Sequence, residues 1–186
     1  LPNAILVDLI QNLEQNQAVV YGDEIVAFHT NETQEEVNFE QYDLVVCHAV
    51  LEWLQNPFEV ISKLVDLVKP GGYLSLSFFN YDAQLFGNML YGNFDYVEQG
   101  MTTKNIVRLS PNNPQKPKII LSQLKNLPVQ IIKKAGIRCF HDYLKQTEKQ
   151  TSEYDQLKQL EIKYGSTEPY LWLGKYFLVI AQKDTW

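Results

Sequence analysis

The middle of the chain constrains the fold most, because it reads as strand, helix, tight turn and strand in direct succession. The apolar runs Tyr42–Cys47 and Tyr73–Phe79 predict two short buried strands. Between them, apolar residues at helical spacing follow Pro57, whose missing N–H costs least at the start of a helix. We expect this helix to end at Lys69, before a Pro-Gly-Gly turn. A helix that connects two buried strands is the βαβ unit of a parallel sheet.

Patterns on either side of this unit extend the predicted α/β fold. An amphipathic helix is expected over Ala4–Gln15, a short strand over Glu24–His29 and a polar loop over Thr30–Asn38. The chain has 186 residues, of which 45% are hydrophobic, so residues 1–186 are expected to form a single domain around one core. The later elements that we expect are a helix at 83–91, a loop at 108–118, a helix at 119–127, an extended segment at 137–140, a helix at 153–164 and a strand at 171–181.

The sequence has no feature typical of a membrane protein. No run approaches the ~18 consecutive apolar residues of a membrane-spanning helix, and no basic-then-apolar leader opens the chain. Cys47 and Cys139 both lie in apolar stretches, which favours buried reduced thiols over a disulfide or a metal site. We therefore expect a cytoplasmic protein that binds no metal.

Charge is distributed unevenly along the chain. The net charge is −6, yet residues 101–150 hold ten Lys or Arg and two acidic residues, a local net charge of +8. Residues 1–50 contain neither Lys nor Arg. Because phosphate binding depends on these two residue types, segment 101–150 is a candidate basic face for a polyanion. The alternative is a loop and a helix whose lysines are simply solvated.

Two groups of motifs resemble a known family. Asp43-Leu-Val-Val-Cys-His-Ala-Val-Leu-Glu-Trp and, about one helix later, Leu67-Val-Lys-Pro-Gly-Gly-Tyr-Leu-Ser-Leu-Ser resemble the middle of class I S-adenosylmethionine methyltransferases, which have a Rossmann-like sheet. Another Rossmann-like fold is the alternative. A second group is similar to the bacterial tRNA 5-carboxymethoxyuridine methyltransferases and runs from about residue 39 to residue 182. Its members are His48-Ala-Val-Leu-Glu-Trp, Gly92-Asn-Phe-Asp-Tyr-Val, Arg108-Leu-Ser-Pro, Phe140-His-Asp-Tyr-Leu, Glu168-Pro-Tyr and Leu173-Gly-Lys-Tyr.

The resemblance implies a reaction. S-adenosyl-L-methionine would donate its methyl group to the carboxylate of 5-carboxymethoxyuridine at the tRNA wobble position, giving the methyl ester. A carboxylate is already ionised at neutral pH, so this displacement needs no strong general base, and we assign no catalytic base and no metal. Two other functions stay open: methylation of a small carboxylic acid, and a non-catalytic remnant that binds RNA or a partner protein.

The resemblance also implies three cofactor contacts. His48 lies at the carboxyl end of the second predicted strand, where open α/β sheets bind ligands, and the family has a cofactor-contacting histidine at the matching position. Asn31 and Glu32 follow the first predicted strand, where the family contacts the adenine region. An ordinary histidine at the end of a strand is the alternative for His48.

Further residues are candidates for substrate binding. Asn80 follows the third predicted strand and would either position the acceptor or cap a turn. Arg108 can clamp a carboxylate or a phosphate with its planar guanidinium. His141 and Tyr143 can bond to and stack on a flipped base, with a place in the core as the alternative for Tyr143. The family motifs add Asn93 and Tyr96, and contacts to the tRNA backbone are expected from Lys104, Lys116, Lys118, Lys133, Lys134 and Arg138.

The glycine-rich turn that opens a class I methyltransferase has no counterpart in the sequence. Only Gly22 precedes Gly71. Leu1–Leu13 resembles the family helix that lies before this turn, while the sequence from Glu24 onward resembles what lies well after it. We therefore expect several tens of residues to be missing near 14–24, either from the printed sequence or by a true deletion, so that the sheet lacks its glycine-rich first strand.

Overall fold

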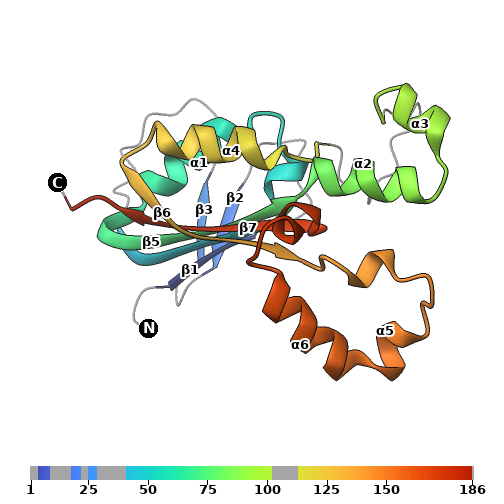
Figure 1. Ribbon diagram of the computed structural model, residues 1–186. Coiled ribbons are helices and arrows are strands. Elements are labelled where there is room, and N and C mark those ends of the chain that lie inside the picture. Colours follow the sequence, from blue (N-terminus) through green and yellow to red (C-terminus); the bar gives the residue numbers. More distant parts are fainter. Residues whose placement is uncertain (1–3, 9–17, 22–24, 29–40, 102–112, 186) are drawn as a thin grey trace.

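The computed structural model describes residues 4–8, 18–21, 25–28, 41–101 and 113–185, with the first three stretches described as backbone alone. Within them a seven-stranded sheet has the order β3-β2-β1-β4-β5-β7-β6 (Figure 1). The strands are β1 (Ala4–Asp8), β2 (Ala18–Tyr21), β3 (Ile25–Phe28), β4 (Tyr42–His48), β5 (Val68–Phe79), β6 (Val129–Ile137) and β7 (Tyr176–Lys183). The predicted α/β sheet is confirmed.

Strand directions determine which edge of the sheet can hold a site. β4 pairs parallel with β1 and β5, whereas β7 pairs antiparallel with both β5 and β6. β6 therefore runs in the same direction as β4 and β5. The carboxyl ends of β1, β4, β5 and β6 and the amino end of β7 all lie at one edge, which we call the carboxyl edge. In open α/β sheets this is the edge that binds ligands.

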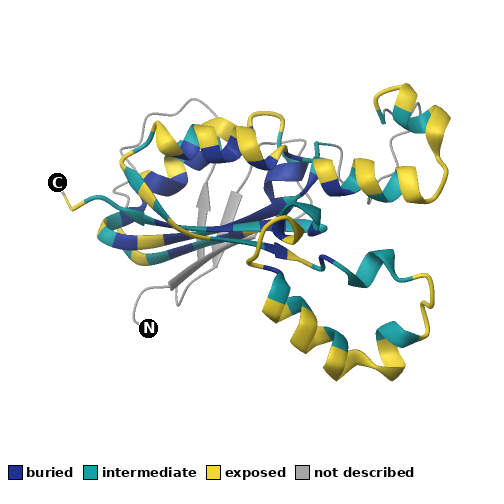
Figure 2. Cartoon of the chain, viewed as in Figure 1, coloured by how far each residue is buried: buried dark blue, intermediate teal, exposed yellow. Residues whose placement is uncertain are grey.

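Two helices cover one face of the sheet and form the core with it. α1 (Pro57–Asp66) connects β4 to β5 and packs beside α4 (Pro117–Lys125). Figure 2 shows the buried residues of both helices on the side that faces the sheet. Ile61 of α1, Ile120 of α4 and Phe78 of β5 are fully buried in one hydrophobic core, as expected for helices with one apolar stripe. Burial of each such side chain stabilises the fold by roughly 1.5–3 kcal/mol. The βαβ unit predicted from the sequence is confirmed.

Two short arms extend beyond the carboxyl edge in Figure 1. One arm consists of α2 (Tyr81–Leu90) and α3 (Phe94–Glu98), and the other of α5 (Lys149–Ser152) and α6 (Tyr154–Tyr164). The short 3-10 turns η3 (His141–Tyr143) and η4 (Tyr170–Leu173) contact α2 of the first arm, and η2 (Leu51–Trp53) contacts β5. The helices expected at 83–91, 119–127 and 153–164 are confirmed as α2, α4 and α6.

Several sequence predictions need correction. The helix expected from Ala4 is wrong at its start, because residues 4–8 form β1 beside β4. A run of apolar residues this short fits a helix or a buried strand equally well. The helix after Pro57 ends at Asp66 rather than Lys69, and the Pro-Gly-Gly sequence lies inside β5. There the pairing with β4 shifts register and Gly71 adopts a φ of 78°, so this sequence forms an irregularity within a strand.

The carboxyl-terminal strands also differ from expectation. The extended segment expected at 137–140 is wrong after Ile137, where β6 ends and the left-handed φ of Arg138 turns the chain. The strand lies earlier than expected, because β6 begins at Val129, and it carries polar side chains because it is an edge strand. The strand expected from Leu171 begins at Tyr176, since η4 precedes it. The loop predicted at 30–38 lies outside the described residues. Within 14–24 only Ala18–Tyr21 are described, so the missing glycine-rich segment stays a prediction.

Both cysteines match the prediction of buried reduced thiols. Cys47 and Cys139 are free and buried. Burial, with an added contribution from a nearby glutamate in each case, raises the pKa of each thiol to about 12, so neither is a thiolate at neutral pH. In the described part of the chain, no helix has the length and apolar content needed to cross a membrane. The same residues contain no group of three His, Cys, Asp or Glu side chains that could hold a metal ion.

Candidate active site at the carboxyl edge

His48 is the last residue of β4 and stands at the carboxyl edge. Its Nε2 atom lies 2.9 Å from the Ser75 hydroxyl on neighbouring β5, and the residue is exposed. The next residue, Ala49, has a φ of 56°, which turns the chain sharply away from the strand. Partial burial lowers the pKa of His48 below its ordinary value, so the imidazole is neutral at neutral pH. A neutral imidazole at this edge can hydrogen bond to a polar ligand.

Asn80 follows β5 and is fully buried. Its Oδ1 accepts a hydrogen bond of 2.9 Å from the Asp82 backbone N–H, which caps α2. Its Nδ2 donates to the carbonyl oxygens of Trp172 at 2.8 Å and Gly174 at 2.9 Å. The side chain therefore ties α2 to η4, and every polar atom that it has is engaged. The capping role that the sequence left open is the one that these bonds show, and the side chain has no exposed surface to offer an acceptor.

Arg138 and Lys175 lie next to each other at the ends of β6 and β7. The Lys175 N–H donates to the Arg138 carbonyl at 3.3 Å, and the Asn80 N–H donates to the Lys175 carbonyl at 3.0 Å. Arg138 adopts a left-handed φ of 61°, which turns the chain at the end of β6. Two cationic residues thus stand at the same edge of the sheet as His48. β5 separates β4 from Lys175 at the start of β7, and both β5 and β7 separate β4 from Arg138 at the end of β6.

The carboxylate of Asp142 interacts with three neighbouring side chains. It accepts hydrogen bonds from the Arg138 guanidinium and from His141 Nδ1 at 2.8 Å, and the Lys175 ammonium lies 3.6 Å away. Burial acts to raise the pKa of Asp142, but the hydrogen bonds from His141 and Arg138 and the charges of Lys175 and Arg138 outweigh it. The pKa therefore lies below its usual value. Arg138 and His141, both predicted from the sequence, are brought together here.

Tyr143 links the same turn to the first arm. Its hydroxyl lies 2.9 Å from the Leu173 carbonyl and 3.2 Å from the Ala83 carbonyl, and its ring meets the edge of Phe86 with centroids 5.2 Å apart. Burial, as the largest cause, raises the pKa of Tyr143 to about 12. These contacts place the ring between α2 and η4, where it holds the arm in place.

The other predicted site residues lie elsewhere. Asn93 is exposed on the first arm and donates to Asn88 Oδ1 at 2.9 Å, and Tyr96 is half-buried in α3. Asn31, Glu32, Arg108 and Lys104 lie outside the described residues, so their assigned roles stay predictions.

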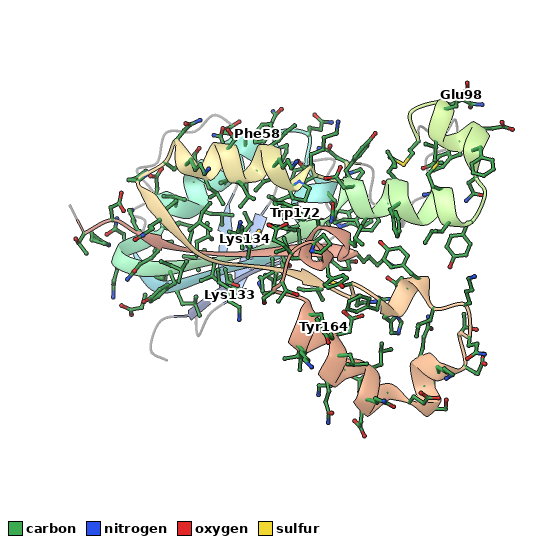
Figure 3. The ribbon with its side chains drawn as sticks, viewed as in Figure 1. Phe58, Glu98, Lys133, Lys134, Tyr164 and Trp172 are labelled. Atoms are coloured by element: carbon green, nitrogen blue, oxygen red, sulfur yellow. The ribbon has the colours of Figure 1, made fainter. Side chains whose placement is uncertain are left out.

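Basic side chains gather on the adjacent elements α4 and β6. The ammonium groups of Lys118 on α4 and Lys134 on β6 lie 5.9 and 5.6 Å from the centroid of the Trp172 ring. Trp172 itself stacks on buried Phe177 at 5.3 Å. Figure 3 shows Lys133 and Lys134 on opposite sides of β6. The described cations of the predicted basic segment on or directly beside these two elements are Lys116, Lys118, Lys125, Lys133, Lys134 and Arg138.

A cavity of about 720 Å³ opens where α1, α2 and α4 begin. Phe58, Tyr81 and Lys116 line it together with the amide side chains of residues 55, 56, 113 and 115. The Lys116 ammonium lies 4.7 Å from the centroid of the Tyr81 ring. The carboxyl-edge region therefore has a hollow beside the basic helix α4, lined by aromatic and amide side chains and by one group of each charge, Lys116 and Glu59.

Sequence reasoning missed three charged residues of this region. Asp142 lies inside a motif used for the resemblance, yet nothing in its spacing indicates that it forms ion pairs with Arg138 and Lys175. Glu161 lies on α6 and accepts three backbone hydrogen bonds from residues 139–141. Glu52 is 2% exposed, and burial raises the pKa of its carboxyl group. Each of these positions depends on tertiary contacts that no local pattern encodes.

One family model matches part of this chain. Residues 6–74, which span β1 to the first part of β5, match the model of the methyltransferase domain family. This similarity agrees with the methyltransferase class predicted from the sequence.

Individual relatives narrow the similarity. The chain is 44% identical over 141 residues to the tRNA 5-carboxymethoxyuridine methyltransferase of Escherichia coli K12, a match that covers 76% of this chain and 54% of that protein. It is 33% identical over 87 residues to the ubiquinone biosynthesis O-methyltransferase of Shewanella pealeana, covering 38% of this chain and 37% of that protein. The chain therefore spans about half the length, or less, of the curated relatives that it matches.

Solved structures show a more distant likeness. An S-adenosylmethionine dependent methyltransferase from Mesorhizobium loti has a TM-score of 0.45 and 10% sequence identity, with 83% of this chain and 67% of that chain covered.

Proposed function

We propose that this protein is an S-adenosylmethionine-dependent methyltransferase of the cytoplasm that methylates tRNA. Its substrate would be the carboxylate of 5-carboxymethoxyuridine at the wobble position, and its product the methyl ester. The observation that carries this proposal is that Arg138 and Lys175 stand at the same edge of the sheet as His48. Three strand spacings separate β4 from β6, or about 14 Å, so one edge can serve both a methyl donor and an anionic acceptor. The 44% identity to a tRNA methyltransferase supports the substrate class.

The residues at the end of β4 fit a polar cofactor. His48 is exposed, neutral and beside the carboxyl end of β1, and the left-handed turn at Ala49 leaves this end of the strand open. His48, with Asn31 and Glu32, would hold S-adenosyl-L-methionine here. When bound, this cofactor supplies an electrophilic methyl group on a sulfonium centre.

The protein's own task is binding and alignment. The acceptor carboxylate is ionised at neutral pH, so no side chain has to remove a proton from it. Arg138 and His141 would hold and orient the carboxylate, with Lys175 adding a third positive or hydrogen-bonding group. A bidentate guanidinium contact fixes both distance and angle of a carboxylate. Such alignment contributes much of the rate enhancement of a displacement reaction that needs no acid or base.

The basic residues of α4 and β6 would bind the tRNA backbone. Lys118 and Lys134 converge on the Trp172 ring, which combines cationic groups with an aromatic surface. Phosphate contacts of this kind position an RNA without reading its sequence. Tyr96 and Asn93 on the first arm would lie along the path of the anticodon loop.

Mass spectrometry of wobble nucleosides tests the proposal. The full-length protein is incubated with S-adenosylmethionine and with tRNA that carries 5-carboxymethoxyuridine. The expected result is loss of the carboxylate nucleoside and gain of its methyl ester, with no change in a tRNA that has an unmodified wobble uridine. Methylation of small carboxylic acids alone, with tRNA binding insensitive to salt, would contradict it. Failure of S-adenosylmethionine to raise the melting temperature would instead favour a non-catalytic binding protein.

A further inference from the structure

We infer that Glu161 is a positioning residue, which holds the turn carrying Arg138 and His141 in the geometry that binds the acceptor. This inference rests on the proposed function, because it concerns the same site. Glu161 lies on α6, more than twenty residues after Arg138, and belongs to none of the motifs that the resemblance uses. Its role follows from the bonds that it makes.

The Glu161 carboxylate accepts three consecutive backbone N–H groups. Oε2 accepts from Cys139 at 2.7 Å, and Oε1 accepts from Phe140 and His141, both at 2.8 Å. Successive N–H groups that point to one place form an anion-binding nest, which favours a full negative charge. A carboxylate fills this nest with two acceptor oxygens, whereas an amide of the same shape has only one. The turn after β6 therefore depends on the charge and on the length of this side chain.

The part of α6 that carries Glu161 is itself firmly anchored. The Gly136 N–H of β6 donates to the Gly165 carbonyl at 2.7 Å, and the Gly165 N–H donates to the Glu161 carbonyl at 2.7 Å. Gly136 has no space for a side chain, since an added Cβ would lie 2.5 Å from the Leu171 carbonyl oxygen. The carboxyl-terminal end of α6 is thus tied directly to the strand that ends at the candidate site.

An aromatic cluster completes this anchor. The Phe140 ring contacts Tyr164 and Tyr170, with centroids 6.3 and 5.4 Å apart, and Tyr164 and Tyr170 contact each other at 5.7 Å. Figure 3 shows Tyr164 on the last turns of α6, where the helix approaches the sheet. Because the helix end is fixed, the Glu161 carboxylate can determine where the backbone of the turn lies.

The turn then presents two functional side chains together. Asp142 binds the side chains of Arg138 and His141, while Glu161 binds the backbone N–H groups of the residues between Arg138 and Asp142. Arg138 has the left-handed φ of 61°, a conformation that needs support from its surroundings in a residue other than glycine. Both carboxylate oxygens of Glu161 accept hydrogen bonds from the backbone. Glu161 would therefore affect binding of the methyl acceptor only through Arg138 and His141.

Glu161→Gln in the full-length protein is the direct test, because it keeps the size and removes the charge. The expected result is a KM for 5-carboxymethoxyuridine tRNA raised about tenfold, with S-adenosylmethionine affinity unchanged. Hydrogen exchange of the amides of residues 139–141 should become faster, a readout that needs no catalysis. Glu153→Gln is the matched control: it makes the same chemical change at the start of α6, where Glu153 pairs with Lys149, and should alter neither value.

A mutant cycle separates positioning from general stabilisation. If Glu161 acts through Arg138 and His141, Glu161→Gln should raise KM little further in a protein that already carries Arg138→Ala and His141→Ala. Equal losses in both backgrounds, or parallel losses of cofactor affinity and melting temperature, would overturn the inference while leaving the tRNA activity in place. Unchanged amide exchange would overturn it as well. A wild-type protein that does not methylate the tRNA at all would instead refute the proposed function, and the exchange experiment would then still decide whether Glu161 holds the turn.

Discussion

Oδ1 of Asp142 lies 2.8 Å from Nδ1 of His141, and the same oxygen accepts a hydrogen bond from the guanidinium of Arg138. One carboxylate oxygen therefore fixes the relative positions of two side chains that the proposed mechanism needs together. The bond to Asp142 also leaves Nε2 of His141 as the ring nitrogen that can turn toward a ligand. Arg138 and Lys175 offset the negative charge of Asp142, which reduces the repulsion between this carboxylate and an anionic acceptor.

Asp142→Asn should weaken acceptor binding. The amide has the same size but lacks the charge that attracts Arg138 and Lys175, so both side chains are less ordered in the free protein. They therefore lose more conformational entropy when an acceptor binds. We expect KM for tRNA to rise about tenfold, corresponding to ~1.4 kcal/mol, with cofactor affinity unchanged. Steady-state kinetics and a separate binding titration with S-adenosylmethionine measure the two effects. Equal loss of both affinities would contradict the assignment.

The depressed pKa of Asp142 predicts an acid-sensitive network. A carboxyl group whose pKa is lower in the folded than in the unfolded protein stabilises the fold above the unfolded pKa, near 3.9. This contribution is lost as the pH falls from about 4 through the lower folded pKa. The melting temperature of the wild type should therefore fall more steeply in this range than that of Asp142→Asn. Parallel curves for the two proteins would show that the network adds no pH-dependent stability.

The sequence was sufficient to predict the layout of the sheet centre. The strands predicted at 42–47 and 73–79 and the helix after Pro57 follow from hydrophobic periods and from Pro chemistry, which are local signals. The first strand was missed because its five residues are too few to distinguish a helical period from a strand. β6 was placed too late because an edge strand with Lys133 and Lys134 lacks the alternation of a half-buried strand.

The sequence predicted only some residues of the candidate site, for a similar reason. Arg138, His141 and His48 belong to short motifs or strand ends, so the local sequence is enough to indicate where they lie in the fold. Asp142 and Glu161 act through bonds that join separate elements or close a turn, and such bonds depend on three-dimensional packing. For Asn80 the sequence suggested a ligand contact that the structure does not support. Its position after β5 suits such a contact, but its side chain is hydrogen-bonded to the carbonyl oxygens of Trp172 and Gly174, which are more than ninety residues away in the sequence.

His48→Ala should weaken cofactor binding before it affects the acceptor. The ring stands at the end of β4, and two strands, β5 and β7, separate it from Arg138, so its loss leaves the acceptor site intact. We expect the Kd for S-adenosylmethionine to rise about tenfold, with salt-dependent tRNA binding unchanged, as measured by calorimetry and by filter binding. In the wild type, where burial lowers the pKa of His48, cofactor affinity should hold as the pH falls to about 6.5 and decline at lower pH as the ring becomes protonated. A decline that persists in His48→Gln would assign the pH dependence to another group.

Arg108→Ala should give the opposite result. Arg108 lies outside the described residues, and its predicted role is to clamp the acceptor carboxylate or a neighbouring phosphate. Methyl transfer to tRNA should be lost or slowed at least a hundredfold while S-adenosylmethionine affinity stays near that of the wild type. Lys125→Ala, at the end of α4, removes one cation from the same basic segment and should reduce tRNA binding only slightly. Similar effects of the two variants would mean that Arg108 contributes general charge and no specific contact.

Asn80→Ala should destabilise the whole carboxyl edge. The change removes the cap of α2, worth ~1 kcal/mol, and leaves the carbonyl oxygens of Trp172 and Gly174 without the amide that binds them. Each unsatisfied buried acceptor costs ~1–3 kcal/mol, so the free energy of unfolding should fall by roughly 3 kcal/mol or more. Denaturant unfolding measures this loss, with Asn93→Ala as the exposed control. Because Asn80 lies between α2, η4 and the Lys175 backbone, its loss should also raise KM for tRNA, whereas a stable variant with impaired methyl transfer alone would indicate direct contact between Asn80 and the acceptor.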